Sequence, residues 1–341
     1  MLNFNLQKKI LNISIPTYNR ADDLYNCLSI LLPQAIYYKD HIDIHVFDNA
    51  STDNTESVIN YFKSKYNFLL YTKNYTNEGY TGNQIKCYST SNGFYTAFLS
   101  DDDIYTDDLL KNIIPILQLK LYSFLALNYY SFKNDYNKIF KSNYADESNV
   151  IFKRPYDILN HPSVGHWSGY IINTELAKKQ LNFIINYKSF LDYELNRGIM
   201  GELIHRALSI STSPSYFFGQ RLLAVKVQNK FDYDTIRHLC LNEILFYKSL
   251  FDQKVILLTD WEYRKKLVFH RLNIAIFFDT YNLSNTEYNN IMLEFQSIYK
   301  NDKYYKKTRL LFYIFSYKCL RILMKYPHLF YRTLKKHFAN K

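Results

Sequence analysis

The sequence predicts an α/β fold with a mainly parallel sheet, followed by a helical C-terminal extension. Over the first 120 residues, short apolar runs alternate with amphipathic segments, which is the order of repeated strand–helix–strand units. Beyond about residue 230 the pattern becomes helical. Apolar residues make up 48% of the chain and charged residues 21%, a balance typical of globular proteins that excludes extensive disorder.

Four runs rich in β-branched and aromatic residues are expected to be strands. They are KILNISIP (9–16), IDIHVFD (42–48), FLLYTKN (68–74) and FYTAFLS (94–100). Each is followed by an amphipathic segment, as expected of a helix with one buried face. These helices are ADDLYNCLSILL (21–32), STDNTESVINYFKSK (51–65), TGNQIKCYST (81–90) and TDDLLKNIIPIL (106–117). A further strand is expected at SFLALNYYSF (123–132) and a helix at DYELNRGIMGELIHRA (192–207).

Polar residues mark the expected helix starts. Ser51 or Thr52 precedes the second helix, and Thr106 precedes the fourth. Acidic residues follow in the first turn, where the helix dipole favours negative charge.

The net charge of +11 is carried by the end of the chain. Residues 300–341 contain 12 of the 42 basic side chains and one of the 31 acidic ones, which leaves 30 of each sign in residues 1–299. Apolar residues alternate with these basic ones at helical spacing, so the segment is expected to bind an anionic membrane surface. The alternative is a helix packed on the domain with solvated charges. No nucleic-acid partner is expected, because no such motif occurs.

Targeting signals are not evident. The four cysteines form no CxxC pair, which argues against a zinc site or a disulfide framework. No run reaches the 18 apolar residues of a spanning helix, and the first residues lack the apolar core of a secretory signal. The sequence therefore predicts a cytoplasmic protein, peripheral on the inner face of the cytoplasmic membrane.

Three consecutive carboxylates, Asp101, Asp102 and Asp103, follow the fourth expected strand. Open parallel sheets bind ligands beyond the carboxyl ends of their strands. Neither GxGxxG nor GxxxxGK[ST] occurs, so a nucleotide diphosphate would need a divalent cation held by carboxylates. The three aspartates are therefore expected to hold Mg²⁺ or Mn²⁺. Taken alone, such a run is more often a helix cap with solvated turn residues.

Four segments stand in order at these strand ends: SIPTYNR (14–20), VFDNASTDNT (46–55), NEGYTGN (77–83) and FLSDDDI (98–104). Together they resemble the landmarks of family 2 glycosyltransferases of the GT-A fold, of the type that builds bacterial O-antigen, lipooligosaccharide or capsule. The resemblance implies a GT-A domain over residues 1–225, with a nucleotide-binding half (1–110) and an acceptor half (111–225). A helical, basic region (226–341) follows.

The resemblance also implies roles for individual residues. Those expected at the nucleotide are Pro16, Thr17 and Tyr18 in the nucleobase pocket, Asp48 at the base or ribose, and Asn77, Gly79 and Asn83 at its border. Tyr18 offers a face for stacking and Asp48 accepts hydrogen bonds. The structural alternatives are simple packing for Tyr18 and an Asx turn before Ser51 for Asp48.

The metal motif of the family is Asp-x-Asp, and Ser100 stands where its first Asp is common. Two registers are therefore open, Ser100-Asp101-Asp102 and Asp101-Asp102-Asp103. Asp102 or Asp103 is expected to bind the metal, with Asp101 toward the ribose or donor sugar.

Catalytic and acceptor residues are expected in the second half of the domain. SFLDYELNRG (189–198) resembles the segment that carries the family's catalytic base, which implies Asp192 as base with Glu194 in reserve. An N-cap is the structural alternative for Asp192. In HPSVGHWSGY (161–170), His166 and Trp167 are expected at the acceptor sugar, although Trp167 could equally be buried packing.

The predicted function is metal-dependent, inverting transfer of one sugar from a nucleotide-sugar to a bacterial surface glycan. A UDP-sugar is the preferred donor and a glycan or lipid-linked glycan the expected acceptor. The alternative is a non-catalytic, membrane-associated scaffold of glycan assembly that retains the nucleotide fold.

Overall fold

A computed structural model describes residues 8–142, 147–186, 198–227, 242–278 and 284–299, together with Asp302 and Tyr305. The chain forms two compact units, residues 1–229 and 230–341.

One sheet of ten strands forms the centre of the first unit. Its strands are β1 (Leu11–Thr17), β2 (Ile42–Asp48), β3 (Leu69–Lys73), β4 (Tyr95–Phe98), β5 (Ile104–Tyr105), β6 (Phe124–Phe132), β7 (Lys141–Ser142), β8 (Val150–Phe152), β9 (Tyr170–Asn173) and β10 (Ser215–Lys226). Its helices are α1 (Ala21–Ala35), α2 (Thr55–Lys65), α3 (Gly79–Thr90), α4 (Leu109–Gln118), α5 (Thr174–Asn186) and α6 (Gly198–Ile210). Three short 3-10 turns are η1 (Ile36–Tyr38), η2 (Pro155–Asn160) and η3 (Trp167–Gly169).

The strand order is β3-β2-β1-β4-β9-β6-β10-β5, with β7 beside β6 and β8 beside β10. The long strands pair in parallel: β1 with β2 and β4, β2 with β3, and β6 with β10. Short antiparallel pairings of β9 join the two parallel parts. The α/β fold with a mainly parallel sheet is therefore confirmed.

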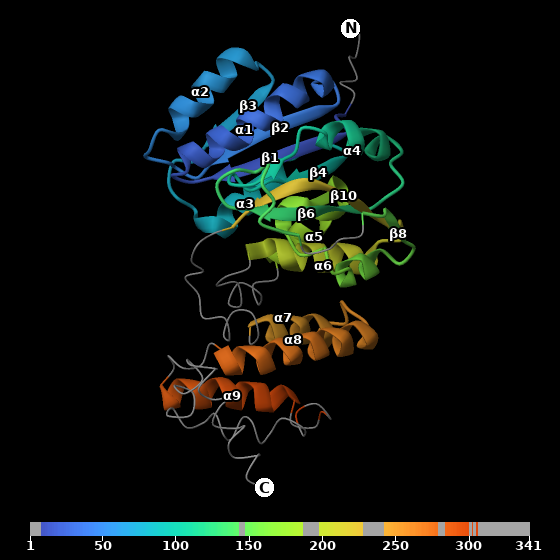
Figure 1. Cartoon of the computed structure of the whole chain (residues 1–341). Coiled ribbons are helices and arrows are strands. Elements are labelled where there is room, and N and C mark those ends of the chain that lie inside the picture. Colours follow the sequence, from blue (N-terminus) through green and yellow to red (C-terminus); the bar gives the residue numbers. More distant parts are fainter. Residues whose placement is uncertain are drawn as a thin grey trace. The chain divides into compact units, whose positions relative to one another are not determined.

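Helices cover both faces of this sheet (Figure 1). Helix α1 packs against α2 and β5, whereas α3 packs against α5, α6 and the first strands. Leu24, Leu28 and Leu31 recur every three or four positions along α1 and are fully buried. Burying each such side chain contributes about 1.5 to 3 kcal/mol, so this stripe fixes α1 on the sheet.

Two helices begin later than the sequence predicts. Helix α2 begins at Thr55 rather than after Ser51 or Thr52, because the Ser51 hydroxyl instead accepts a hydrogen bond from Asn19 N (2.9 Å). Helix α4 begins at Leu109, because Thr106 donates its backbone N–H to Leu222 O (3.1 Å) on β10. Residues expected to be caps thus hold loops to other elements.

The strand order creates a topological switch point between two particular strands. After β1 the chain builds β2 and β3 on one side, then returns to place β4 on the other side of β1. The ends of β1 and β4 therefore diverge at a topological switch point, where open α/β sheets bind ligands.

Three helices are described in the second unit: α7 (Asn242–Asp252), α8 (Leu258–Phe278) and α9 (Asn285–Tyr299). The buried Lys265 of α8 pairs with Glu262 (2.7 Å) and Asp302 (2.8 Å), and its carbonyl accepts the Tyr299 hydroxyl (2.9 Å). The helical extension is confirmed for these ranges. Among all described helices, none combines the length and apolarity needed to span a bilayer.

Candidate active site

The ends of the first three strands lie in register. Thr17 of β1 pairs with Asp48 of β2, which pairs with Lys73 of β3. Two predicted nucleotide residues, Thr17 and Asp48, are thus neighbours at one sheet edge. The loop after β1 is fixed to the loop after β2, because Asn19, in a left-handed conformation (φ 52°), accepts Thr52 N at 2.8 Å.

Asp48 is fully buried and both of its carboxylate oxygens accept hydrogen bonds. Oδ1 accepts Ser51 N (2.8 Å), which is the Asx turn considered as its structural alternative. Oδ2 accepts the Tyr71 hydroxyl at 2.8 Å. Burial, together with this bond to Asp48, raises the pKa of Tyr71. Asp48 therefore shapes the loop whether or not it also binds a ligand.

Asn49 organises the loop that carries Asn77 and Gly79, and sequence reasoning missed it. Its amide nitrogen donates to Asn77 Oδ1 (2.8 Å) and Gly79 O (3.1 Å), and its Oδ1 accepts Glu78 N (2.9 Å). Gly79 has a φ of 73°, which favours glycine at the start of α3. The only signal in the sequence is the position of Asn49 directly after Asp48.

The other predicted nucleotide residues differ in exposure. Tyr18 is 43% exposed, as stacking on a base requires, and Pro16 is half-buried. Asn83 is buried and donates to Phe47 O (2.9 Å), so it fixes α3 to β2. Its own Oδ1 is buried with no hydrogen-bond partner among the described residues.

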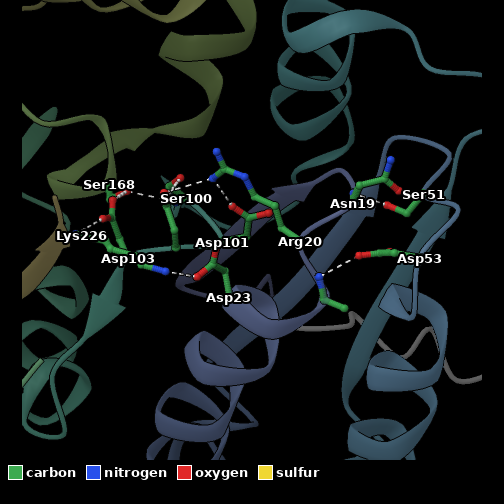
Figure 2. Close-up of polar contacts among 12 residues, drawn as sticks. Asn19, Arg20, Asp23, Ser51, Asp53, Ser100, Asp101, Asp103, Ser168 and Lys226 are labelled. Carbon is green, nitrogen blue, oxygen red and sulfur yellow. Dashed lines mark hydrogen bonds and ion pairs between the residues drawn. The ribbon is translucent and has the colours of Figure 1, made fainter. Parts of the chain in front are cut away.

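Arg20 follows β1 and reaches two aspartates that follow β4. Its Nη1 donates to Asp101 Oδ1 at 3.1 Å and to Asp102 Oδ2 at 3.0 Å. Figure 2 shows the guanidinium beside Asp101 at the switch point. Burial raises the pKa of Asp101 to about 6, against the lowering effect of Arg20. Ser100, directly before the three aspartates, donates its hydroxyl to Asp102 Oδ1 at 2.6 Å.

Asp103 is held in a different way from its two neighbours. Its Oδ2 accepts the Ser168 hydroxyl (2.6 Å), and its Oδ1 accepts Lys226 N (3.0 Å) at the end of β10 (Figure 2). Burial, with repulsion from Asp102, raises the pKa of Asp103 well above its usual range. This carboxyl group therefore ties β10 and the loop before β9 to the acidic motif.

The loop predicted to meet the acceptor lies directly against this motif. His166 Nδ1 is 3.5 Å from Asp103 Oδ2, but burial lowers the pKa of His166 to about 4, so its ring is neutral at neutral pH. Trp167 is half-buried, with its ring edge-on to Tyr170 at 5.7 Å. Packing thus accounts for part of the Trp167 side chain. Ser168, which sequence reasoning did not single out, makes the closest contact with Asp103.

The oxygen-rich end of β4 fits a divalent cation whose ligands come partly from these carboxylates and partly from a bound nucleotide. Within the described part of the chain, no three His, Cys, Asp or Glu side chains are grouped to hold a metal by themselves. Mg²⁺ is usually bound by one or two carboxylates together with substrate phosphates, which needs no such group. Arg20 already stands as a positive group between Asp101 and Asp102, where a cation would be attracted.

Two predicted catalytic residues, Asp192 and Glu194, lie outside the described residues, in the gap 187–197. Helix α6 begins at Gly198, directly after this gap, and packs against α3 and α5.

Comparison with known proteins identifies the class of this domain. Residues 13–179 match the family described as glycosyl transferase family 2. The structure is similar to that of TarS (residues 1–349) from S. aureus, with a TM-score of 0.62 and 14% identity over 97% of this chain and 91% of that one. It is also similar to the mannosyltransferase PcManGT of Pyrobaculum calidifontis, with a TM-score of 0.53 and 12% identity over 94% and 89% of the two chains. Residues 13–179 therefore match a family 2 glycosyltransferase domain, and the fold is similar to that of TarS, as the sequence motifs predicted.

Curated relatives match a shorter stretch. The abequosyltransferase RfbV of Salmonella typhimurium is 36% identical over 113 residues, which is 33% of this chain and 32% of that protein. WfaP of Escherichia coli, a UDP-Glc:α-D-GlcNAc-diphosphoundecaprenol β-1,3-glucosyltransferase, is 31% identical over 122 residues, or 36% and 47%. The chain thus spans less than half the length of these two relatives. Both are bacterial sugar transferases by their names, which agrees with the predicted family.

Proposed function

We propose that the protein transfers one sugar from a nucleotide-sugar to a glycan acceptor of the bacterial surface, with inversion at the anomeric carbon. The observation that carries this proposal is the meeting of Arg20, Asp101 and Asp102 at the β1–β4 switch point of a family 2 domain. A UDP-sugar is the preferred donor, since one similar structure, TarS, is in complex with UDP-GlcNAc. A lipid-linked glycan is the preferred acceptor, by analogy with WfaP.

The donor would lie across the ends of β1, β2 and β4. Tyr18 would stack on the base, while Thr17 and Asp48 lie at the same edge. Asn77 and Gly79 are held in place by Asn49 and would border the nucleotide.

A divalent cation, Mn²⁺ or Mg²⁺, would be held by Asp102 and would neutralise charge on the departing diphosphate. Asp102 is preferred to Asp103, because Asp103 is held by a buried hydroxyl and a backbone N–H, whereas Asp102 Oδ2 is held by the side chain of Arg20, which is 40% exposed. Asp101 would then lie toward the ribose or donor sugar.

In the transfer step, the acceptor hydroxyl oxygen bonds to the anomeric carbon while the bond from that carbon to the diphosphate breaks. Asp192 would take the hydroxyl proton as general base, with Glu194 in reserve. His166 and Trp167, which lie in the loop against Asp103, would contact the acceptor sugar.

The proposal is tested with a panel of UDP-, GDP-, dTDP- and CMP-sugars, scored for binding and slow hydrolysis with Mn²⁺ or with EDTA. We expect one sugar nucleotide to bind and hydrolyse only with Mn²⁺. Binding without any hydrolysis or transfer would favour the scaffold instead. Asp192→Asn should lower transfer by about a hundredfold while leaving nucleotide binding nearly intact; if only Glu194→Gln has this effect, Glu194 is the base.

We also propose that the basic end of the chain binds anionic lipid on the inner face of the membrane. Residues 306–341 lie outside the described residues, so this proposal rests on their sequence. The test is flotation with anionic and neutral liposomes of the full chain and a variant with Lys306, Lys307 and Arg309 changed to Gln. A matched variant changes the exposed Lys63, Lys111 and Lys179 to Gln. Salt-sensitive flotation lost only in the first variant supports the proposal, and equal flotation of all three chains contradicts it.

A further inference from the structure

Arg20 is the positive group that compensates Asp101 and Asp102. The two carboxylates are adjacent in sequence and their side chains are only 5% and 9% exposed. Repulsion between such groups is costly where solvent is excluded, so the pair needs a cation close by. Arg20 Nη1 lies within 3.1 Å of both carboxylates, and its guanidinium keeps its charge at any physiological pH.

The Arg20 side chain is placed so that it could leave these carboxylates without disturbing the fold. It is 40% exposed, whereas the aspartates are buried. Its backbone is fixed separately: Arg20 O accepts Leu24 N (2.9 Å) in the first turn of α1, and the next residue, Ala21, donates its N–H to Asp53 (3.0 Å). Only side-chain rotation would be needed.

The contacts of Arg20 also differ from those of a permanent ion pair. Both use the same nitrogen, Nη1, and neither carboxylate receives the two parallel bonds that make an arginine–carboxylate pair strong. That two-pronged geometry suits a phosphate equally well.

We propose that Arg20 is an exchangeable counter-ion: it neutralises Asp101 and Asp102 while the site holds no donor, and turns to the donor diphosphate when a divalent cation binds the carboxylates. This inference rests on the proposed function. It makes Arg20 a positioning residue that couples the two ligands. Metal alone has to displace Arg20 from the carboxylates and leaves the guanidinium without an anionic partner. Metal and diphosphate together give the guanidinium a new partner.

The test measures Mn²⁺ binding, from the electron paramagnetic resonance signal of free Mn²⁺, with and without UDP. The chains are the wild type, Arg20→Ala, Arg20→Lys and the control Arg154→Ala. Arg154 is exposed to a similar extent and pairs with Asp157, three residues along the chain, instead of the acidic motif. Arg20→Gln removes the same charge but keeps a hydrogen-bond donor, in case Arg20→Ala does not fold.

We expect Arg20→Ala to bind Mn²⁺ alone about tenfold more tightly than the wild type, the size of one charged hydrogen bond in a partly exposed setting. The factor by which UDP strengthens Mn²⁺ binding should fall about tenfold, because the guanidinium no longer links the two sites. Arg20→Lys should retain part of this coupling, and Arg154→Ala all of it.

Two results would overturn the inference in distinguishable ways. If UDP binds and Arg20→Ala matches the wild type in both Mn²⁺ affinity and coupling, Arg20 is not a counter-ion but the proposed function stands. If no chain binds UDP with or without Mn²⁺, the proposed function fails and the role of Arg20 fails with it.

Discussion

Ser168→Ala should destabilise the acidic motif, because it removes two hydrogen bonds made by one hydroxyl. Ser168 Oγ donates to Asp103 Oδ2 at 2.6 Å and accepts the backbone N–H of Ser100 at 3.0 Å. Ser168 is fully buried and Asp103 is 1% exposed, so water cannot replace the lost hydroxyl without rearrangement.

The magnitude follows from these two unsatisfied groups. Each buried polar group left without a partner costs about 1 to 3 kcal/mol, which gives about 2 to 6 kcal/mol for both. Asp103 keeps its bond from Lys226 N, and its raised pKa allows it to become neutral, so we expect the lower part of this range, about 2 to 3 kcal/mol.

Ser163→Ala is the matched control in the same loop. Ser163 is also buried, at 1% exposure, but its hydroxyl has no hydrogen-bond partner among the described residues. Removing a buried, unsatisfied hydroxyl should change the stability by no more than about 0.5 kcal/mol, or increase it.

The assay is urea unfolding of the full chain, combined with hydrogen exchange of the peptide that covers residues 98–105. Ser168→Ala should lower the unfolding midpoint and speed exchange of this peptide, which contains the Ser100 amide, while Ser163→Ala should do neither. Equal effects of the two substitutions on both measurements would refute the reasoning.

Two further substitutions test the fold around the site. His45→Gln should reduce the loss of stability between pH 6.5 and 4. Burial lowers the pKa of His45 to about 4, so over this range the unfolded chain takes up a proton that the folded chain does not. The stability of the wild type therefore falls as the pH falls. Because His45 is only half-buried, we expect about 1 to 2 kcal/mol across this window, measured by urea unfolding at each pH. Gly93→Ala should cost at least about 2 kcal/mol, since its Cβ would lie 2.6 Å from Asn12 N and from Tyr95 O, and a melting temperature equal to the wild type would contradict this.

The sequence was sufficient to predict the first half of the domain because each signal there is local. Alternating apolar and amphipathic segments place β1 to β4 and the helices between them, and parallel topology then brings SIPTYNR, DNAST and SDDD to one edge. Helix starts were less predictable. Ser51 has the chemistry of a helix cap, but it is used by Asn19, a residue 32 positions earlier in the chain.

The contacts of the site could not be predicted, because they join residues far apart in sequence. Arg20 meets Asp101 across 81 positions, Ser168 meets Asp103 across 65, and Lys226 N meets Asp103 across 123. Many serines in this chain could donate to a carboxylate, and nothing local distinguishes Ser168 from Ser163 in the same loop. Only the packing of η3 against β4 and β6 selects it.

The three consecutive aspartates are therefore not equivalent in the fold, because the charge of each is compensated by different groups. Asp103 is compensated by a backbone N–H on β10 and a buried hydroxyl, which cannot move away unless this part of the fold unfolds. Asp101 and Asp102 share a half-exposed guanidinium on a long side chain, which can leave. The proposed transfer reaction would require the site to bind and release a highly charged ligand at each turnover, which needs both kinds of compensation, one to keep the strand ends together and one to be exchanged. The acidic run is thus best understood as one structural carboxyl group beside an exchangeable pair, and Ser100 keeps Asp102 oriented by a hydrogen bond that adds no further charge to that pair.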